Sequence, residues 1–275
     1  MTAWQAVLSW REARPSIERV TSHLGYAEPH TETDVSGTCN EVSVSHISIL
    51  GGPGRPDRLS DVTLSIPEGA IVGLVGPNGS GKTSLCLAIA GLLQPYVGSM
   101  EVLGCDVSRH DWSRTFPGVQ LVPQRARVFS TTVRENICLG LSIPDALIND
   151  MLKRVELYET IASLPENLDT ELSEERNTLS AGELQKLCLV RALLRKPKLL
   201  IMDEALSGVA VSDLDAVFTL LRDAVCAKGG KILIAFHGSH ILPYCDSVVE
   251  LSGPANARAS LGGEPGVARK EEHVE

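Results

Sequence analysis

The chain has 275 residues, of which 43% are hydrophobic and 21% charged, and its formal net charge is -9 at pH 7. This length and composition allow one substantial hydrophobic core, or one core with a smaller subdomain, and they predict a globular α/β protein. The acidic balance argues against a free-standing nucleic-acid binder, which usually presents a basic surface, so we expect no nucleic-acid partner.

The cysteines and the apolar runs bear on the compartment. The seven cysteines are odd in number and form no C-x-x-C pair, which favours free thiols in a reducing cytoplasm. The first residues lack a signal-peptide pattern, and no apolar run reaches the roughly 18 residues that a transmembrane helix needs. If the protein serves a membrane, we expect something else to cross it.

The chain begins with a stretch that we expect to lie outside the main domain. Apolar residues recur at helical spacing over residues 4–25, with Pro15 at the start of a second helical stretch, so we predict an amphipathic helical linker over residues 1–38. Residues 41–49 and 59–66 then alternate as strands do and are separated by a glycine-rich turn. They predict an antiparallel β ribbon.

A glycine-rich loop follows and carries the first chemistry. Residues 70–75 are apolar and β-branched, which predicts a buried parallel strand, and residues 84–93 are apolar and compatible with a helix. Between them the sequence GPNGSGKTS fits the pattern G-x-x-x-x-G-K-[ST], in which backbone N–H groups and a helix N-terminus surround a polyphosphate. A chance glycine-rich turn would not have both flanks. We predict a nucleotide-phosphate site made of Gly76, Pro77, Asn78, Gly79, Ser80, Gly81, Lys82, Thr83 and Ser84.

Each polar side chain of this loop has an expected role. Lys82 would reach the β- and γ-phosphates, and the Thr83 hydroxyl would be a ligand of Mg²⁺. Downstream, the apolar run 198–202 predicts a strand that ends in Asp203 and Glu204. Asp203 would then lie on the Mg²⁺ side, directly or through water, and Glu204 would act on a water in line with the γ-phosphate. Ordinary surface acids after a buried strand are the alternative.

A third apolar strand is predicted at residues 231–236 and ends in His237. A lone histidine at a strand end is usually incidental. Here the phosphate loop, the two carboxylates and the histidine follow three predicted strands, so we expect all of them at one edge of one sheet.

The region before the second of these strands resembles the signature region of ATP-binding-cassette (ABC) ATPases. The usual LSGGQ is LSAGE here, made of Leu179 followed by Ser180, Ala181, Gly182 and Glu183. Residues 122–124 (VPQ) resemble the Q-loop, 129–137 (FSTTVRENI) the segment that follows it in exporter-type cassettes, and 170–176 the X-loop. His237 matches the switch histidine. The resemblance covers roughly residues 41–252, in the family's order.

The resemblance implies a P-loop NTPase (RecA-like) core with an antiparallel β subdomain and a helical subdomain at about 126–189, all within a cassette at 39–252. It further implies a MgATP-dependent ATPase whose catalytic residues are Glu204, His237 and Gln124, with Gln124 also near the Mg²⁺. Ser180 and Gly182 would contact ATP bound on a second cassette, in a dimer around two ATP molecules. The dimer would drive a membrane partner at the cytoplasmic face of a membrane.

The two ends are interpreted in the same frame. The linker at 1–38 resembles the end of an exporter's membrane domain, so the chain is either the cassette half of a split exporter or part of a longer polypeptide. An independent amphipathic helix is the alternative. The tail at 253–275, rich in glycine and charge, is expected to be disordered.

Several residues depart from the family's pattern. We assign His46 to the position of the aromatic that stacks on adenine, where an imidazole has less area to offer. Ala210 replaces the aspartate of the D-loop, the segment after Glu204.

Two functions therefore stay open, an ATPase that drives export and an ATP-gated dimerisation module with little turnover. A small-molecule kinase would not need LSAGE, and a DNA-repair cassette would carry a long coiled-coil insertion.

The altered signature bears on the partner. Glu183 replaces a neutral amide by a carboxylate near another subunit's triphosphate, where like charges repel. This predicts a heterodimer whose other cassette supplies an LSGGQ-like segment. The alternative is a homodimer in which the Glu183 carboxylate turns to solvent or to a helix N-terminus.

Overall fold

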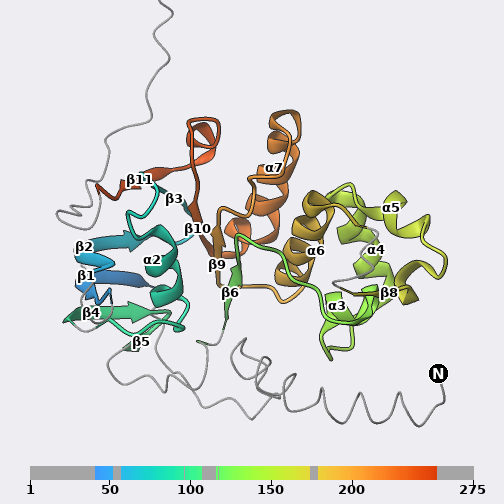
Figure 1. The fold of residues 1–275 in the computed structure, drawn as a ribbon, viewed down its shortest axis with the longest axis horizontal. Coiled ribbons are helices and arrows are strands. Elements are labelled where there is room, and N and C mark those ends of the chain that lie inside the picture. The colour runs from blue at the N-terminus through green and yellow to red at the C-terminus, as the bar shows by residue number, and fades with distance from the viewer. Residues whose placement is uncertain are drawn as a thin grey trace, which may run out of the picture.

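The computed structural model describes residues 41–252, apart from 52–56, 96, 107–115, 117 and 174–178. The predicted linker at 1–38 and the predicted tail at 253–275 lie outside the described residues, as does part of the X-loop segment. Figure 1 shows an antiparallel sheet at one end and a group of helices at the other, with the strands of a central parallel sheet between them. No helix in the described part is long and apolar enough to cross a membrane.

A five-stranded parallel sheet forms the centre of the molecule. Its order is β11-β3-β10-β9-β6, made of Ser247–Glu250, Ile71–Val75, Lys231–Ala235, Leu199–Asp203 and Val119–Val122. Every residue of β9 and β10 is buried, as expected for parallel strands covered on both faces. Ala235 is in register with Leu74 on one side and Asp203 on the other, so the carboxyl ends of three strands lie side by side.

The two faces of this sheet pack against different layers. Leu199 and Ile201 of β9 belong to a core shared with α2 (Lys82–Ile89) and with the antiparallel sheet. Leu200 and Met202 belong to the core of the other face, with α6 (Ala181–Leu193) and α7 (Leu214–Ala224). The alternation of side chains along one strand thus supplies both cores.

The predicted β ribbon is present and is part of a four-stranded antiparallel sheet. The order is β2-β1-β4-β5, made of Leu59–Ile66, Val42–Ile49, Val97–Val102 and Cys105–Asp106. Helix α2 lies between this sheet and the central one, as Figure 1 shows. It begins and ends earlier than residues 84–93, because Gly81 (φ 98°) precedes its first turn and Gly91 (φ 80°) follows its last.

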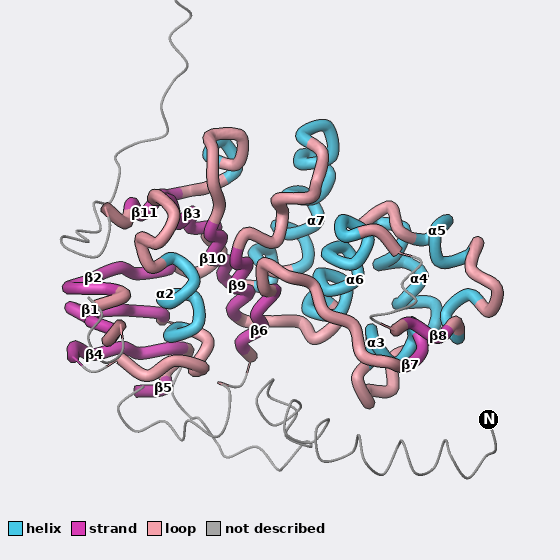
Figure 2. The backbone as a smooth tube through the Cα atoms, viewed as in Figure 1, coloured by secondary structure: helices cyan, strands magenta, loops and turns pink. Residues whose placement is uncertain are grey.

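The helical part lies at the far end of the central sheet, where cyan helices dominate Figure 2. It includes the helices α3 (Val133–Cys138), α4 (Asp145–Arg154) and α5 (Tyr158–Ala162), and the short ribbon β7 (Thr131–Thr132) with β8 (Glu171–Leu172). Helix α6 continues to Leu193, beyond the expected limit near 189, because Leu187, Leu189 and Val190 are buried along it. Single 3-10 turns complete the chain at Asn167–Asp169, Val211–Asp213, Cys226–Lys228 and Leu242–Tyr244.

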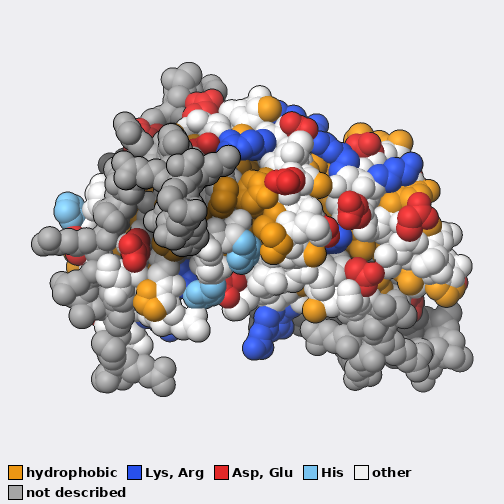
Figure 3. Space-filling view, turned by 90° about the horizontal axis from the view of Figure 1, so that it is seen from above, with side chains coloured by type: hydrophobic (Ala, Val, Ile, Leu, Met, Phe, Trp, Pro, Cys, Tyr) orange, Lys and Arg blue, Asp and Glu red, His pale blue; other side chains and the backbone are white. Residues whose placement is uncertain are grey.

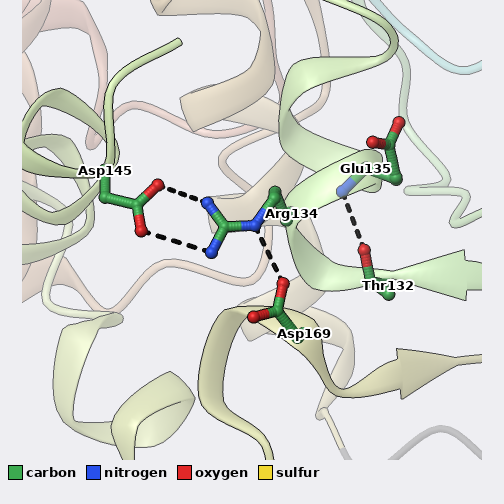
Figure 4. A network of polar contacts seen from close by, with 5 residues as sticks. All are labelled: Thr132, Arg134, Glu135, Asp145 and Asp169. Atoms are coloured by element: carbon green, nitrogen blue, oxygen red, sulfur yellow. Dashed lines mark hydrogen bonds and ion pairs between the residues drawn. The ribbon is translucent and has the colours of Figure 1, made fainter. Parts of the chain in front are cut away.

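One arginine ties three segments of the helical part together. Arg134 of α3 donates from Nε to Asp169 Oδ1 at 2.8 Å and pairs through its other nitrogens with both oxygens of Asp145 at the start of α4, as Figure 4 shows. The hydrogen bond from Arg134 lowers the pKa of Asp169. Next to it, Thr132 Oγ1 accepts from the N–H of Glu135 at 3.1 Å and caps α3.

The α/β architecture that the sequence predicts is therefore present, with parallel core, antiparallel subdomain and helical part. On the face seen in Figure 3, acidic and basic side chains are interspersed over the helical part.

Candidate functional site

The phosphate loop connects β3 to α2, as the pattern predicted. Gly76, Pro77, Asn78, Gly79, Ser80 and Gly81 form the loop, and Lys82, Thr83 and Ser84 form the first turn of the helix. A Cβ at Gly76 would lie 2.4 Å from the carbonyl oxygen of Leu251, and one at Gly81 would lie 2.4 Å from Leu59 Cδ2. The fold therefore leaves room only for glycine at these two positions.

Lys82 lies folded back over this loop. Its Nζ donates to the carbonyl oxygens of Gly76 at 2.8 Å and Pro77 at 3.2 Å. Burial lowers the pKa of Lys82, while the nearby carboxylates of Glu204 and Asp203 act in the opposite direction. A buried cation near the loop is a charge that a polyphosphate could recruit.

Asp203 ends β9 beside the loop. It hydrogen-bonds to Thr83, and its burial raises its pKa above the ordinary value for an aspartate. Among the described residues, Asp203 Oδ1 and the Ser80 hydroxyl are buried without a hydrogen-bond partner. Buried oxygens of this kind next to a glycine loop suit a hard cation and the phosphates it accompanies.

Glu204 is the centre of the catalytic group that the sequence predicted. Its carboxylate contacts Gln124, which follows β6, and His237, which follows β10. Gln124 Nε2 donates to Glu204 Oε2 at 2.6 Å, and His237 Nε2 lies 2.7 Å from Glu204 Oε1. The Glu204 side chain is 17% exposed and that of His237 is 41% exposed, so a solvent molecule can reach the group from one side. The expected convergence of three strand ends is therefore present.

The backbone at Glu204 is held in an uncommon conformation. Its φ is 51°, a value that residues other than glycine rarely adopt, and its N–H donates to the carbonyl oxygen of Ala235 at 2.9 Å. Backbone strain of this kind clusters at functional sites, where the surrounding structure maintains it.

The signature segment begins helix α6, away from this group. Ser180 is the N-cap, and Ala181, Gly182 and Glu183 form the first turn. The Glu183 carboxylate faces its own helix terminus, with Oε2 2.7 Å from the backbone N–H nitrogen of Ser180 and 2.8 Å from its hydroxyl. Thr160 of α5 donates to the other oxygen, Oε1, at 3.1 Å. The hydrogen bonds from Ser180, followed by that from Thr160, lower the pKa of Glu183.

His46 is not part of either group. It lies at a β-bulge in the middle of β1, with φ 53°, and its Nδ1 is 2.6 Å from Asp61 Oδ1 on β2. The part of the ribbon that touches the phosphate loop is instead Arg58 and Leu59, next to Gly81. The imidazole thus has a partner within the sheet, and its role against adenine stays a prediction.

Two features of the site were not identified from the sequence. Ser180 and Glu183 form a capping box, and the signal for it in the sequence is a serine followed three residues later by a glutamate. Gln185, which is 9% exposed, donates from Nε2 to the carbonyl oxygen of Gln124 at 3.3 Å. No local pattern indicates that contact, because the two residues are distant in the chain.

Comparisons with known proteins identify the family. A family model described as "ABC transporter" matches residues 59–207. The chain is 31% identical over 248 residues to a sophorolipid transporter of Starmerella bombicola, and 29% identical over 253 residues to the type I secretion system ATP-binding protein PrsD of Rhizobium meliloti. These matches cover 88% and 91% of this chain, but only 18% and 41% of those relatives, so the chain spans less than half of their length.

A solved structure shows the same fold. It is described as a bacterial Atm1-family ABC exporter with ATP bound, and it aligns with a TM-score of 0.70 at 24% identity over 77% of this chain and 37% of that one. The chain therefore belongs to the ABC transporter family, within which it corresponds to the nucleotide-binding cassette of exporter-type transporters.

Proposed function

We propose that this chain binds and hydrolyses ATP as a subunit or domain of an ABC exporter. The observation that carries the proposal is the Glu204 carboxylate between Gln124 and His237, at the sheet edge that also holds the phosphate loop. A general base, a polar positioning group and a phosphate site are thereby within one small region.

The residues present fit ATP with Mg²⁺. The glycine loop and Lys82 would bind the β- and γ-phosphates, and the unpartnered Ser80 hydroxyl would add a hydrogen bond. Thr83, Asp203 and Gln124 would hold Mg²⁺, which supplies charge neutralisation on the β- and γ-phosphates.

The chemistry assigned to the side chains is hydrolysis in line. Glu204 takes a proton from a water whose oxygen attacks the γ-phosphorus, and the bond between that phosphorus and the β,γ-bridging oxygen breaks. ADP and inorganic phosphate leave, and the proton returns to solvent. His237 orients Glu204 and the transferred group, while Lys82 stabilises negative charge on the phosphoryl oxygens.

The signature would serve a second cassette. Ser180 and Gly182, at the N-terminus of α6, would meet the γ-phosphate of ATP bound on a partner, with Ala181 and Glu183 beside them. The Glu183 carboxylate is hydrogen-bonded to Ser180 and Thr160 and its lowered pKa keeps it ionised, so its direction is that of the homodimer alternative while its charge, on which the heterodimer hypothesis rests, is retained. The geometry corresponds to the alternative in which the carboxylate turns to a helix N-terminus.

Transport needs a membrane domain, which we assign to another chain or to another part of a longer polypeptide. The relatives are named as transporters and as a type I secretion system ATP-binding protein, and they are longer than this chain. On this proposal the cassette acts at the cytoplasmic face of a membrane.

A second function, an ATP-gated dimerisation module with little turnover, is favoured by one observation. The Ser180 hydroxyl is bonded to Glu183 and must change partner before it can donate to a phosphate. Release of phosphate from ATP by the purified chain, measured together with ATP-dependent dimerisation by sedimentation, separates the two. Rapid turnover supports the ATPase, whereas ATP-dependent dimers with no phosphate release support the module.

A further inference from the structure

Three functional segments meet at the side chain of Gln185. It extends from the second turn of α6, the helix that begins with the signature, and its Nε2 donates to the backbone oxygen of Gln124. On its other side lies Gly208 of the D-loop. A Cβ built on Gly208 would be 2.7 Å from Gln185 Oε1 and 3.5 Å from Gly182 Cα, so the D-loop backbone lies directly against the amide.

The amide is retained there at a cost. Gln185 is 9% exposed, and its Oε1 is buried with no hydrogen-bond partner in the part of the chain that the structure describes. A buried, unsatisfied oxygen destabilises the fold, and an apolar side chain of similar size would avoid that penalty. The contact with Gln124 therefore calls for an explanation other than packing.

A continuous path of contacts runs through this side chain. Gln185 bonds to the backbone of Gln124, whose side chain in turn bonds to Glu204. Gly208 follows Glu204 in the chain and returns to Gln185, which closes the path. Since α6 is a single helix, a shift of the Q-loop at Gln185 moves Ser180 at its N-terminus as well.

We propose that Gln185 is a positioning residue that couples this chain's own nucleotide site to the signature that it offers to a partner. The inference rests on the proposed function. When the Gln124 side chain leaves Glu204 to take part in nucleotide binding, the backbone oxygen of Gln124 moves, and its hydrogen bond with Gln185 Nε2 either displaces Gln185 or breaks. Occupancy of one ATP site thereby changes the geometry at the other, which is a coupling between two sites through one buried amide.

One replacement separates the effect of the Gln185 amide from that of its volume, and a second serves as its control. Gln185→Leu keeps the volume but removes the donor, so turnover should fall about fivefold and the Hill coefficient for ATP should fall toward one, with ATP affinity of the monomer within about twofold. Gln120→Leu on β6 is the matched control, because its Nε2 donates to the neighbouring carbonyl of Val119 and lies outside the path. Its Hill coefficient should equal that of the parent.

The Gly208 contact allows a rescue experiment. Gly208 has no left-handed φ, so alanine suits its backbone, yet the new methyl would collide with Gln185 Oε1. Gly208→Ala should lower turnover about tenfold. In a Gln185→Ala background the space is free, and the same change should alter turnover less than about twofold, whereas Gln185→Leu should not rescue it.

The outcomes distinguish the two proposals. If the parent hydrolyses ATP but the effects at positions 185 and 208 are additive, or if Gln185→Leu leaves the Hill coefficient unchanged, the coupling role is overturned while the ATPase stands. If the parent shows no hydrolysis with any partner, the proposed function fails first. Should Gly208→Ala fold poorly, the thermal midpoint gives the same test, because Gln185→Ala should restore it and Gln185→Leu should not.

Discussion

Oε1 of Glu204 lies 2.7 Å from Nε2 of His237, although the two residues follow different strands of the parallel sheet. The strand register brings them together, since Asp203 is paired with Ala235. Gln124 occupies the other oxygen of the same carboxylate. The carboxylate is therefore oriented from two sides, and each of its oxygens keeps a second lone pair that can accept a proton from a water.

Replacing Glu204 by glutamine tests whether it is the base. Glu204→Gln keeps the shape of the side chain but removes the carboxylate that takes the proton, so turnover should fall by roughly 10² or more while ATP still binds. An ATP-bound dimer should accumulate, measured by sedimentation in MgATP. Glu250→Gln, at the exposed end of β11, is the matched control. If the Glu204 variant hydrolyses ATP at the parent rate, another group is the general base, and His237 is the first candidate.

Lys82→Ala tests the phosphate loop. The side chain is 5% exposed and bonds to the carbonyls of Gly76 and Pro77, so it is held over the loop. Its loss should weaken ATP binding by at least about tenfold, since a desolvated charge pair contributes roughly 2–4 kcal/mol. Calorimetric titration with ATP measures the effect, and Lys228→Ala on the exposed turn after α7 should not change it. An unchanged affinity in the Lys82 variant would contradict the assignment of the loop.

Glu183 gives a pH-dependent prediction of stability. Its pKa is lowered from 4.5 by the hydrogen bonds from Ser180, so its ionised form stabilises the fold above that pH. At pH 7, Glu183→Gln should lower the free energy of unfolding by about 0.5–1 kcal/mol, and this difference should shrink as the pH falls through the depressed pKa. Denaturant unfolding from pH 7 to pH 3 measures it. Glu135→Gln is the control, because Glu135 has the same position in the first turn of α3, three residues after the N-cap Thr132. It measures how the loss of a first-turn carboxylate changes the free energy of unfolding in another helix.

The same carboxylate decides between the two dimer hypotheses. Because it is bonded to its own helix terminus, we expect Glu183→Gln combined with Ala181→Gly to change turnover and self-association by less than about threefold. Sedimentation and phosphate release in MgATP measure both quantities. A gain well above that range would revive the heterodimer hypothesis, since it would show that the altered signature limits self-association.

The sequence predicted what local patterns encode. The buried strands, the glycine loop and the carboxylates at Asp203 and Glu204 follow from short apolar runs and motif spacing, and the structure has them in the expected places. The sequence left two directions open for the Glu183 carboxylate, toward another subunit's triphosphate or toward solvent or a helix N-terminus, and the structure has it in the capping box with Ser180.

Features that depend on register and tertiary contacts could not be predicted in this way. His46 reads as one more residue of an alternating strand, and only the bulge between Val44 and Ile47 gives it a positive φ and directs its ring to Asp61. Gln185 reads as a polar position in a helix. Its burial and its contact with Gln124 exist because α6 packs against the Q-loop, which no local window contains.

A buried asparagine joins the helical part to α6, and it gives the last prediction. Asn136 of α3 is fully buried; its Nδ2 donates to the carbonyls of Phe129, Thr131 and Thr132, and its Oδ1 accepts from the N–H of Phe129. Arg191 of α6 donates to its backbone oxygen at 2.6 Å. The side chain therefore satisfies several backbone groups of the partly buried segment before α3.

Asn136→Ala removes the four hydrogen bonds that this side chain makes to backbone groups before α3, so the free energy of unfolding should fall by about 2–4 kcal/mol. The loss should be seen first in the segment before α3, as faster amide exchange at Phe129, whereas amides of the central strand β10 stay protected. Asn149→Ala on the half-buried face of α4 is the control, with an expected change within about 0.5 kcal/mol. Equal losses in the two variants would show that the network around Asn136 contributes nothing beyond ordinary packing.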